Sequence, residues 1–260
     1  MSGQISANKR VIIVGASNVT RGLRSLIVQT ATQLGGSVEF LIAAGYGRSL
    51  GISSQVIIRR LPSIRECELW NELRKRPELP TFALVTDLGN DLPYEIPVPQ
   101  ILFWFEDLLR TLSEHQANIV YASLPIASIQ RIQRWQFNVL RRVLFPGSNL
   151  RFEDAIQFAQ ELDEKSKKIS NFFSVKLIEP SDHWYGFDPI HIKRRFLSEA
   201  WQTYTHHWLA EDQTLHPATD NKTRIPTRRL RPFRRWIVNR EQLHSQPCWH
   251  SPKVGSISLY

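Results

Sequence analysis

Two short segments carry the residue types that serine chemistry needs. Ser17 follows an apolar run and a glycine at position 15, and Asp188 precedes His191 by three residues. A serine hydroxyl is a weak nucleophile that needs a base to accept its proton during attack. His191 can titrate near neutral pH and suits that role, and Asp188 can hold the imidazole in one tautomer. Together the three side chains could make and break an acyl–serine bond.

Each segment also has an ordinary structural interpretation. Ser17 could cap the helix that begins near residue 20, and Asp188 could cap the last helix and leave His191 exposed in its first turn. The glycines after the second apolar run could simply allow a turn. The chemical hypothesis therefore depends on whether the fold brings these segments together.

Apolar runs alternate with amphipathic segments along the first 212 residues, a pattern that predicts a parallel sheet covered by helices on both faces. We expect a three-layer α/β/α fold with a five-stranded parallel sheet and flavodoxin-like winding. The predicted strands are 10–14, 38–43, 82–86, 118–122 and 173–178, and the predicted helices are 20–34, 53–68, 99–112, 129–144, 152–172 and 191–208.

The polar candidates follow the predicted strands at their carboxyl ends. Ser17 follows the first strand, Gly45 and Gly47 the second, Asn90 the third, and Asp188 stands in the loop after the fifth. Ligands of open α/β sheets bind outside the carboxyl ends of the strands. We therefore expect these loops to meet at one edge of the sheet.

This order of residues resembles the SGNH (GDSL) hydrolases, which have a serine after strand one, a glycine after strand two, Gly-Asn-Asp after strand three and Asp-x-x-His near the end. The match runs over residues 15–191. The resemblance implies that Ser17 is the nucleophile and that Asp188 and His191 complete the triad. It also implies an oxyanion hole made of the Ser17 and Gly47 backbone N–H groups and the Asn90 side-chain amide.

One departure from the family pattern is visible. The usual Gly-Asp-Ser becomes Gly-Ala-Ser here, because Ala16 replaces the aspartate. The nucleophile survives this change. Within the loop after the second strand, Gly47 matches the oxyanion position better than Gly45 by its place in the loop.

Competing site types fit the sequence less well. A dinucleotide-binding turn needs an acidic residue at the end of the second strand, where Ala43 and Ala44 stand instead. The α/β-hydrolase elbow G-x-S-x-G needs glycine where Val19 stands. His206 and His207 have no cysteine or carboxylate cluster beside them, so we expect no metal site.

The charge is concentrated beyond residue 212. The chain of 260 residues carries 33 Lys and Arg against 24 Asp and Glu, a net charge of +9. Residues 213–260 hold nine of the basic residues and two of the acidic ones, which leaves 24 basic and 22 acidic residues in 1–212. We expect a catalytic domain over 1–212 and a basic, poorly ordered extension over 213–260. The alternatives for this extension are a patch for nucleic acid or anionic lipid and an arm that docks on the body or on a second subunit.

We therefore expect a serine hydrolase that cleaves a carboxylic ester or thioester of a small molecule through an acyl-serine intermediate, with no metal or organic cofactor. The alternatives are an O-acyltransferase of the same fold and a non-catalytic binding protein that uses the cleft and the basic extension. No apolar run is long enough to span a membrane. With two cysteines and no secretory signal in the sequence, we expect a cytoplasmic location.

Overall fold

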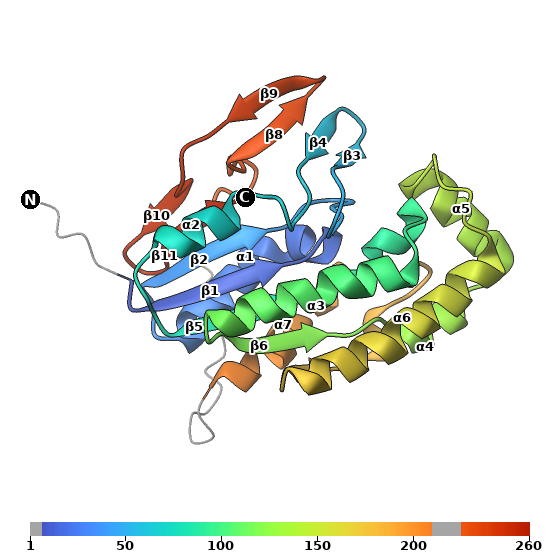
Figure 1. Ribbon diagram of the computed structural model, residues 1–260, viewed down its shortest axis with the longest axis horizontal. Coiled ribbons are helices and arrows are strands. Elements are labelled where there is room, and N and C mark those ends of the chain that lie inside the picture. The colour runs from blue at the N-terminus through green and yellow to red at the C-terminus, as the bar shows by residue number, and fades with distance from the viewer. Residues whose placement is uncertain (1–6, 210–224) are drawn as a thin grey trace, which may run out of the picture.

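A mixed sheet of seven strands forms the centre of the molecule (Figure 1). The computed structural model describes residues 7–209 and 225–260. The strand order is β10-β11-β2-β1-β5-β6-β7, and every neighbouring pair except β10 and β11 is parallel. Five neighbouring strands of this sheet are β1 (Lys9–Val14), β2 (Val38–Ala43), β5 (Thr81–Val85), β6 (Asn118–Ala122) and β7 (Lys176–Ile178).

Helices cover both faces of this sheet because the central strands are apolar on both sides. In β1, Val11 and Ile13 face one buried cluster, to which α1 and α7 contribute, whereas Ile12 and Val14 face a second cluster with α2, α3 and α6. Such continuous apolar runs are typical of buried parallel strands. The helices are α1 (Ser17–Gln33), α2 (Leu69–Lys75), α3 (Val98–Glu114), α4 (Ile126–Gln130), α5 (Arg134–Leu144), α6 (Phe152–Phe172) and α7 (Leu197–Thr205). Short 3-10 segments are η1 (Leu88–Tyr94), η2 (Asp182–Trp184), η3 (Arg194–Phe196) and η4 (His206–Trp208).

All five predicted strands are present and lie in the order second, first, third, fourth, fifth. The predicted strand count is wrong, because two further strands extend the sheet beyond β2. Strand β11 (Gly255–Leu259) pairs in parallel with β2, and β10 (Trp249–Ser251) pairs antiparallel with β11. Both belong to the segment expected to lie outside the fold.

The expectation of a poorly ordered extension is therefore wrong for residues 225–260. Val254, Ile257 and Tyr260 are each at most 3% exposed, and they bury apolar surface along the edge that β2 would otherwise leave open. An open edge of unpaired N–H and C=O groups favours the addition of a strand. The predicted boundary at residue 212 lies outside the described residues.

A second, smaller sheet also depends on this segment. Its strand order is β3 (Ser54–Val56), β4 (Arg59–Leu61), β8 (Arg234–Ile237) and β9 (Arg240–Leu243), all antiparallel. Helix was predicted over 53–68, which is wrong, because 54–61 form a hairpin and α2 begins only at Leu69. In Figure 1 this small sheet stands above the main sheet, and α5 and α6 lie at the right.

The closing helix starts later than predicted. Helix was expected from residue 191, but α7 begins at Leu197 after the short η3 segment. Residues 185–193 are therefore a loop at the carboxyl edge of the sheet, and this loop carries the predicted aspartate and histidine. Within the described residues, no helix has the length and apolarity needed to cross a membrane.

Gly255 allows the last strand to enter the main sheet, so its replacement should loosen that contact. Its φ is +105°, and a Cβ added there would lie 2.0 Å from the Val38 carbonyl oxygen. We expect Gly255→Ala to lower the free energy of unfolding by about 1–3 kcal/mol, because the backbone is strained and must move. Denaturant unfolding followed by circular dichroism measures this. Gly147→Ala is the control, because a Cβ there meets nothing within 4 Å. Equal stability of Gly255→Ala and the parent would contradict the role given to this contact.

Candidate active site

Three side chains from two loops form a continuous hydrogen-bonded chain. Ser17 is the first residue of α1, directly beyond β1, and His191 lies in the loop before η3. Ser17 Oγ is 2.7 Å from His191 Nε2, and His191 Nδ1 is 2.6 Å from Asp188 Oδ2. The structure thus brings together the three predicted triad residues, which are 174 positions apart at the extremes.

The surroundings of Asp188 favour its charged form. Its second oxygen, Oδ1, accepts hydrogen bonds from the Ile190 and His191 backbone N–H groups at 3.1 and 3.2 Å. Burial alone would raise the pKa of Asp188, but the His191 ring and these two N–H groups outweigh it and hold the pKa below its usual value. A carboxylate only accepts hydrogen bonds, so Nδ1 of His191 donates and Nε2 is left to accept the Ser17 proton.

Two residues that the sequence did not single out hold the loops in place. Asn18 Nδ2 donates to Asp87 Oδ1 at 2.8 Å and to the Ile190 carbonyl at 3.0 Å, and its Oδ1 accepts from the Ile192 N–H at 2.9 Å. Asp87 also accepts the Ala16 N–H at 2.8 Å. The loops after β1 and β5 and the loop before η3 are thereby joined next to Ser17. The sequence offered one signal for each residue. Asn18 directly follows the candidate nucleophile, and Asp87 begins the segment Asp-Leu-Gly-Asn-Asp.

Two of the predicted oxyanion donors, Asn90 and Gly47, differ in their position relative to the cavity. Asn90 lines the same cavity as Ser17, and its Nδ2 donates one hydrogen to the Arg48 carbonyl at 2.8 Å. Gly47 lies in the adjoining loop with φ of +62°, where the Tyr94 hydroxyl donates to its carbonyl. Gly47 is not one of the described residues that line the cavity. The roles of Asn90 and Gly47 as oxyanion donors stay predictions.

Asp91, the last residue of the Gly-Asn-Asp motif, forms hydrogen bonds with the loop that contains Gly47. It is 1% exposed, and it accepts hydrogen bonds from the Ser49 hydroxyl and from the Leu50 N–H, the latter at 3.0 Å. Burial raises the pKa of Asp91 to about 6, although the Ser49 hydroxyl and the N–H groups of Leu50 and Gly51 oppose the rise. Asp91 therefore links η1 to the loop after β2, which contains Gly47.

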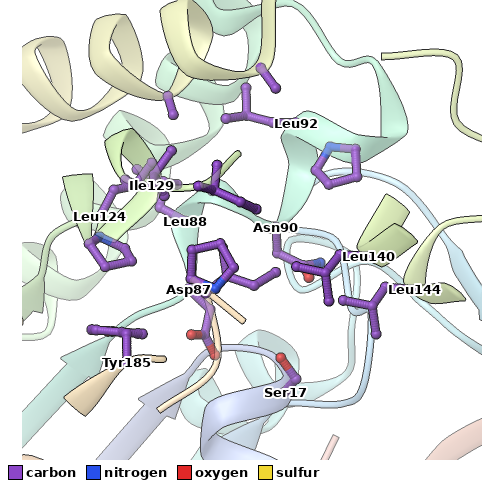
Figure 2. A pocket seen from close by; sticks show the side chains of 18 of the residues that line it. Ser17, Asp87, Leu88, Asn90, Leu92, Leu124, Ile129, Leu140, Leu144 and Tyr185 are labelled. Atoms are coloured by element: carbon purple, nitrogen blue, oxygen red, sulfur yellow. The ribbon is translucent and has the colours of Figure 1, made fainter. Parts of the chain in front are cut away.

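An apolar cavity of about 160 Å³ opens from Ser17 (Figure 2). In Figure 2 the Ser17 hydroxyl points into the cavity and Leu92 lies well away from it, toward the opposite end. Helices α4 and α5 form one wall, and α6 and η1 form others. Its apolar lining includes Leu88, Leu92, Leu124, Ile129, Leu140, Leu144, Ile156 and Ala159. Such walls suit a hydrocarbon group rather than a sugar.

His183, in η2, is hydrogen-bonded to other partners. His183 Nε2 is 2.9 Å from Glu199 Oε1, and its Nδ1 is 2.8 Å from the Ser181 hydroxyl. It is therefore not placed as a rival to His191. Over residues 7–209 and 225–260, no group of three or more His, Cys, Asp or Glu side chains is arranged to hold a metal ion.

Comparison with known proteins identifies the fold. No protein-family model matches the sequence, and no curated protein matches it. Solved structures do match. The carbohydrate acetylesterase Est24 from Sinorhizobium meliloti is 11% identical with a TM-score of 0.53, over 77% of this chain and 98% of that one. The acetyl xylan esterase AlAXEase is 12% identical with a TM-score of 0.52, over 77% of this chain and all of that one (100%).

The chain shares the fold of these two esterases. At this identity the likeness is one of architecture, so the chemistry is inferred from the side chains of this chain. The expected α/β class is confirmed, and the sheet, which was expected to be parallel, is mostly parallel.

Asp91 should make the stability depend on pH between its unfolded and folded pKa values. The folded pKa of about 6 lies above the ordinary 3.8, so the fold favours the protonated form. Its contribution is fully present below about pH 4 and is lost as the pH rises through 6, by about 3 kcal/mol. We expect Asp91→Asn to lack this component. Denaturant unfolding of both proteins from pH 4 to 7 measures the difference, and parallel pH profiles would refute it.

Proposed function

We propose that this protein hydrolyses a carboxylic ester or thioester through an acyl-enzyme intermediate on Ser17. One observation carries the proposal, which is the hydrogen-bonded chain Ser17–His191–Asp188 at the mouth of an apolar cavity. The shared fold supports it, since the two solved structures described above are esterases.

The first half of the reaction forms the acyl-enzyme. Ser17 Oγ attacks the ester carbonyl carbon while His191 Nε2 accepts the hydroxyl proton. Asp188 stabilises the resulting imidazolium, because it is held in its charged form beside Nδ1. The tetrahedral intermediate then collapses, the bond to the alcohol or thiol breaks, and His191 returns its proton to that leaving group.

The second half repeats these steps with water. His191 accepts a proton from the water, hydroxide adds to the acyl carbon, and Ser17 leaves with the proton from His191. The oxyanion of both intermediates would be stabilised by the Ser17 and Gly47 N–H groups and by the Asn90 amide. Asn90 has a second N–H beyond the one given to the Arg48 carbonyl, and that hydrogen is the one proposed for this purpose.

The acyl half of the ester would lie in the apolar cavity. A cavity of about 160 Å³ is close to the roughly 150 Å³ apolar cavity that holds a benzene ring, which has six carbons. We infer an acyl chain of about six to eight carbons. Each buried methylene stabilises the bound chain by about 0.8 kcal/mol.

The expected cytoplasmic location stays a prediction. Cys67 and Cys248 are both free thiols, and Cys67 is buried, which supports a reducing compartment such as the cytoplasm. The proposed chemistry draws only on side chains and backbone groups of the chain.

Ser17→Ala should abolish turnover. We expect kcat on a p-nitrophenyl ester to fall about 10⁴–10⁶-fold, and labelling by a fluorophosphonate probe to disappear. Ser123→Ala is a matched control, because Ser123 lines the same cavity and its Oγ has no hydrogen-bond partner among the described residues. Turnover that survives Ser17→Ala, or an unlabelled parent protein, would overturn the proposal. Turnover that begins only when an acceptor alcohol is added would assign acyl transfer instead.

The cavity predicts a preference for medium-length acyl chains. From acetyl to hexanoyl, kcat/KM should rise about 10²-fold, as four added methylenes are buried. Ile129→Trp fills the cavity wall on α4 and should shift the preference toward acetyl, whereas Leu92→Ala enlarges the far end and should shift it toward longer chains. Gln130→Trp, next to Ile129 but exposed, is the control. A p-nitrophenyl ester series from C2 to C12 measures all four proteins. A flat chain-length profile in the parent would exclude this use of the cavity.

A further inference from the structure

One face of the small sheet, here called the inner face, is turned toward the site. Paired residues of antiparallel strands lie on the same face. Arg59 of β4 pairs with Val56 of β3 and with Ile237 of β8, and Arg235 lies two residues before Ile237, on the same side. The inner face is therefore defined by Val56, Arg59, Arg235 and Ile237.

The inner face packs over the loop that follows β2. A Cβ added to Gly47 would lie 2.7 Å from Val56 Cγ2, and one added to Gly45 would lie 2.4 Å from Leu61 Cδ1, which is also on this face. That loop holds the proposed oxyanion donor Gly47, and the carbonyl of Arg48 in the same loop accepts the Asn90 amide. Val56 and Leu61 of the inner face thus contact the loop whose Arg48 carbonyl accepts the hydrogen bond of Asn90, a residue that lines the Ser17 cavity.

These arginines have no carboxylate partners within residues 7–209 and 225–260. Arg235 Nε donates to the neutral Gln242 Oε1 at 2.8 Å, and neither Arg59 nor Arg235 forms an ion pair with a described residue. The outer face differs. There Arg234 pairs with Glu241 at 3.2 Å, and the Arg60 guanidinium lies 4.5 Å from the centre of the Trp236 ring.

The inner-face arginines also repel one another. Burial, followed by the charges of Arg231 and Arg59, lowers the pKa of Arg235. Burial likewise lowers the pKa of Arg59, against the opposing effect of Tyr46. Half-buried like charges without counter-ions destabilise the unliganded protein, and a bound anion would relieve that cost.

We propose that Arg59 and Arg235 bind a phosphate group carried by the alcohol or thiol half of the ester. This rests on the proposed function, with the acyl half in the cavity and the phosphate on the other side of Ser17. Guanidinium groups bind phosphate through paired hydrogen bonds. A compact phosphate suits this pair better than a nucleic-acid backbone does, because both arginines are half-buried.

Ligand binding tests the site without turnover. Calorimetry on the Ser17→Ala protein compares 1-octanoyl-glycerol 3-phosphate with 1-octanoyl-glycerol, which has the same acyl chain and no phosphate. We expect the phosphate-bearing ligand to bind about ten- to a hundredfold more tightly, as charge-assisted hydrogen bonds allow. Equal affinity for the two ligands would overturn the proposal, and this comparison requires no change to the arginines.

Variants on the two faces of the sheet locate the effect. Arg59→Gln with Arg235→Gln should remove the preference for the phosphate, whereas Arg60→Gln with Arg234→Gln removes the same charge from the outer face of the same strands and should keep it. Arg59→Lys with Arg235→Lys keeps the charge and should retain part of the preference if the glutamine variant does not fold. An equal loss on both faces would show only a general charge effect and would refute the assigned site.

Further arms separate the outcomes. Fluorophosphonate labelling and ester turnover report on the proposed function alone, so phosphate preference without turnover would leave the anion site standing and the hydrolase refuted. Turnover without phosphate preference would support the hydrolase and refute the anion site. Sedimentation with phosphatidylglycerol vesicles distinguishes a lipid source, and binding to vesicles but not to the monomeric ligand would overturn the proposed site.

Discussion

The geometry around Ser17 depends on the hydrogen bonds that the Asn18 and Asp87 side chains form with each other and with the backbone. Ser17 is the first residue of α1, whereas Asp188 and His191 lie in an irregular loop, so bonds between the two segments must fix their relative position. Asn18 bonds to Asp87 and to the backbone of Ile190 and Ile192, while Asp87 also accepts the N–H that precedes Ser17. One of these bonds is buried and the others are partly buried, so an unpaired amide or carboxylate there would be costly. They hold the imidazole loop against the start of α1, so the serine–histidine distance is set by the scaffold.

The part of the site predicted from the sequence is the part that topology determines. In a parallel sheet the carboxyl ends of the strands lie at one edge, so residues just after β1, β5 and β7 had to converge. Ser17, Asp188 and His191 could therefore be placed together from the strand pattern and residue types. The positioning roles of Asn18 and Asp87 could not be predicted in this way, because both are common turn residues and their bonding partners are distant in the sequence.

Two of the errors in the predicted fold, the hairpin and the extra strands, involve pairing between distant segments. Residues 54–61 form a hairpin, and its second strand, β4, also pairs with β8, about 175 positions later. Likewise β11 completes the edge of β2 across more than 200 positions. Local periodicity reports which face of a segment is apolar, and it carries no signal for a partner this far away. A composition rich in proline and arginine therefore resembled a poorly ordered extension.

The same long-range pairing gives the basic segment a place beside the site. Arg48, in the loop after β2, is almost fully buried and donates to the Tyr260 carbonyl and, at 3.2 Å, to the Pro62 carbonyl. Burial of a guanidinium group is costly unless its N–H groups are bonded. Arg48 thus bonds the loop that carries Gly47 to residues that directly follow a strand of each sheet. Strand β8, which contains Arg235, belongs to the same C-terminal segment as Tyr260. Under the proposed assignment, Arg59 and Arg235 would supply positive charge on the leaving-group side of the site, whereas the acyl side is an apolar cavity.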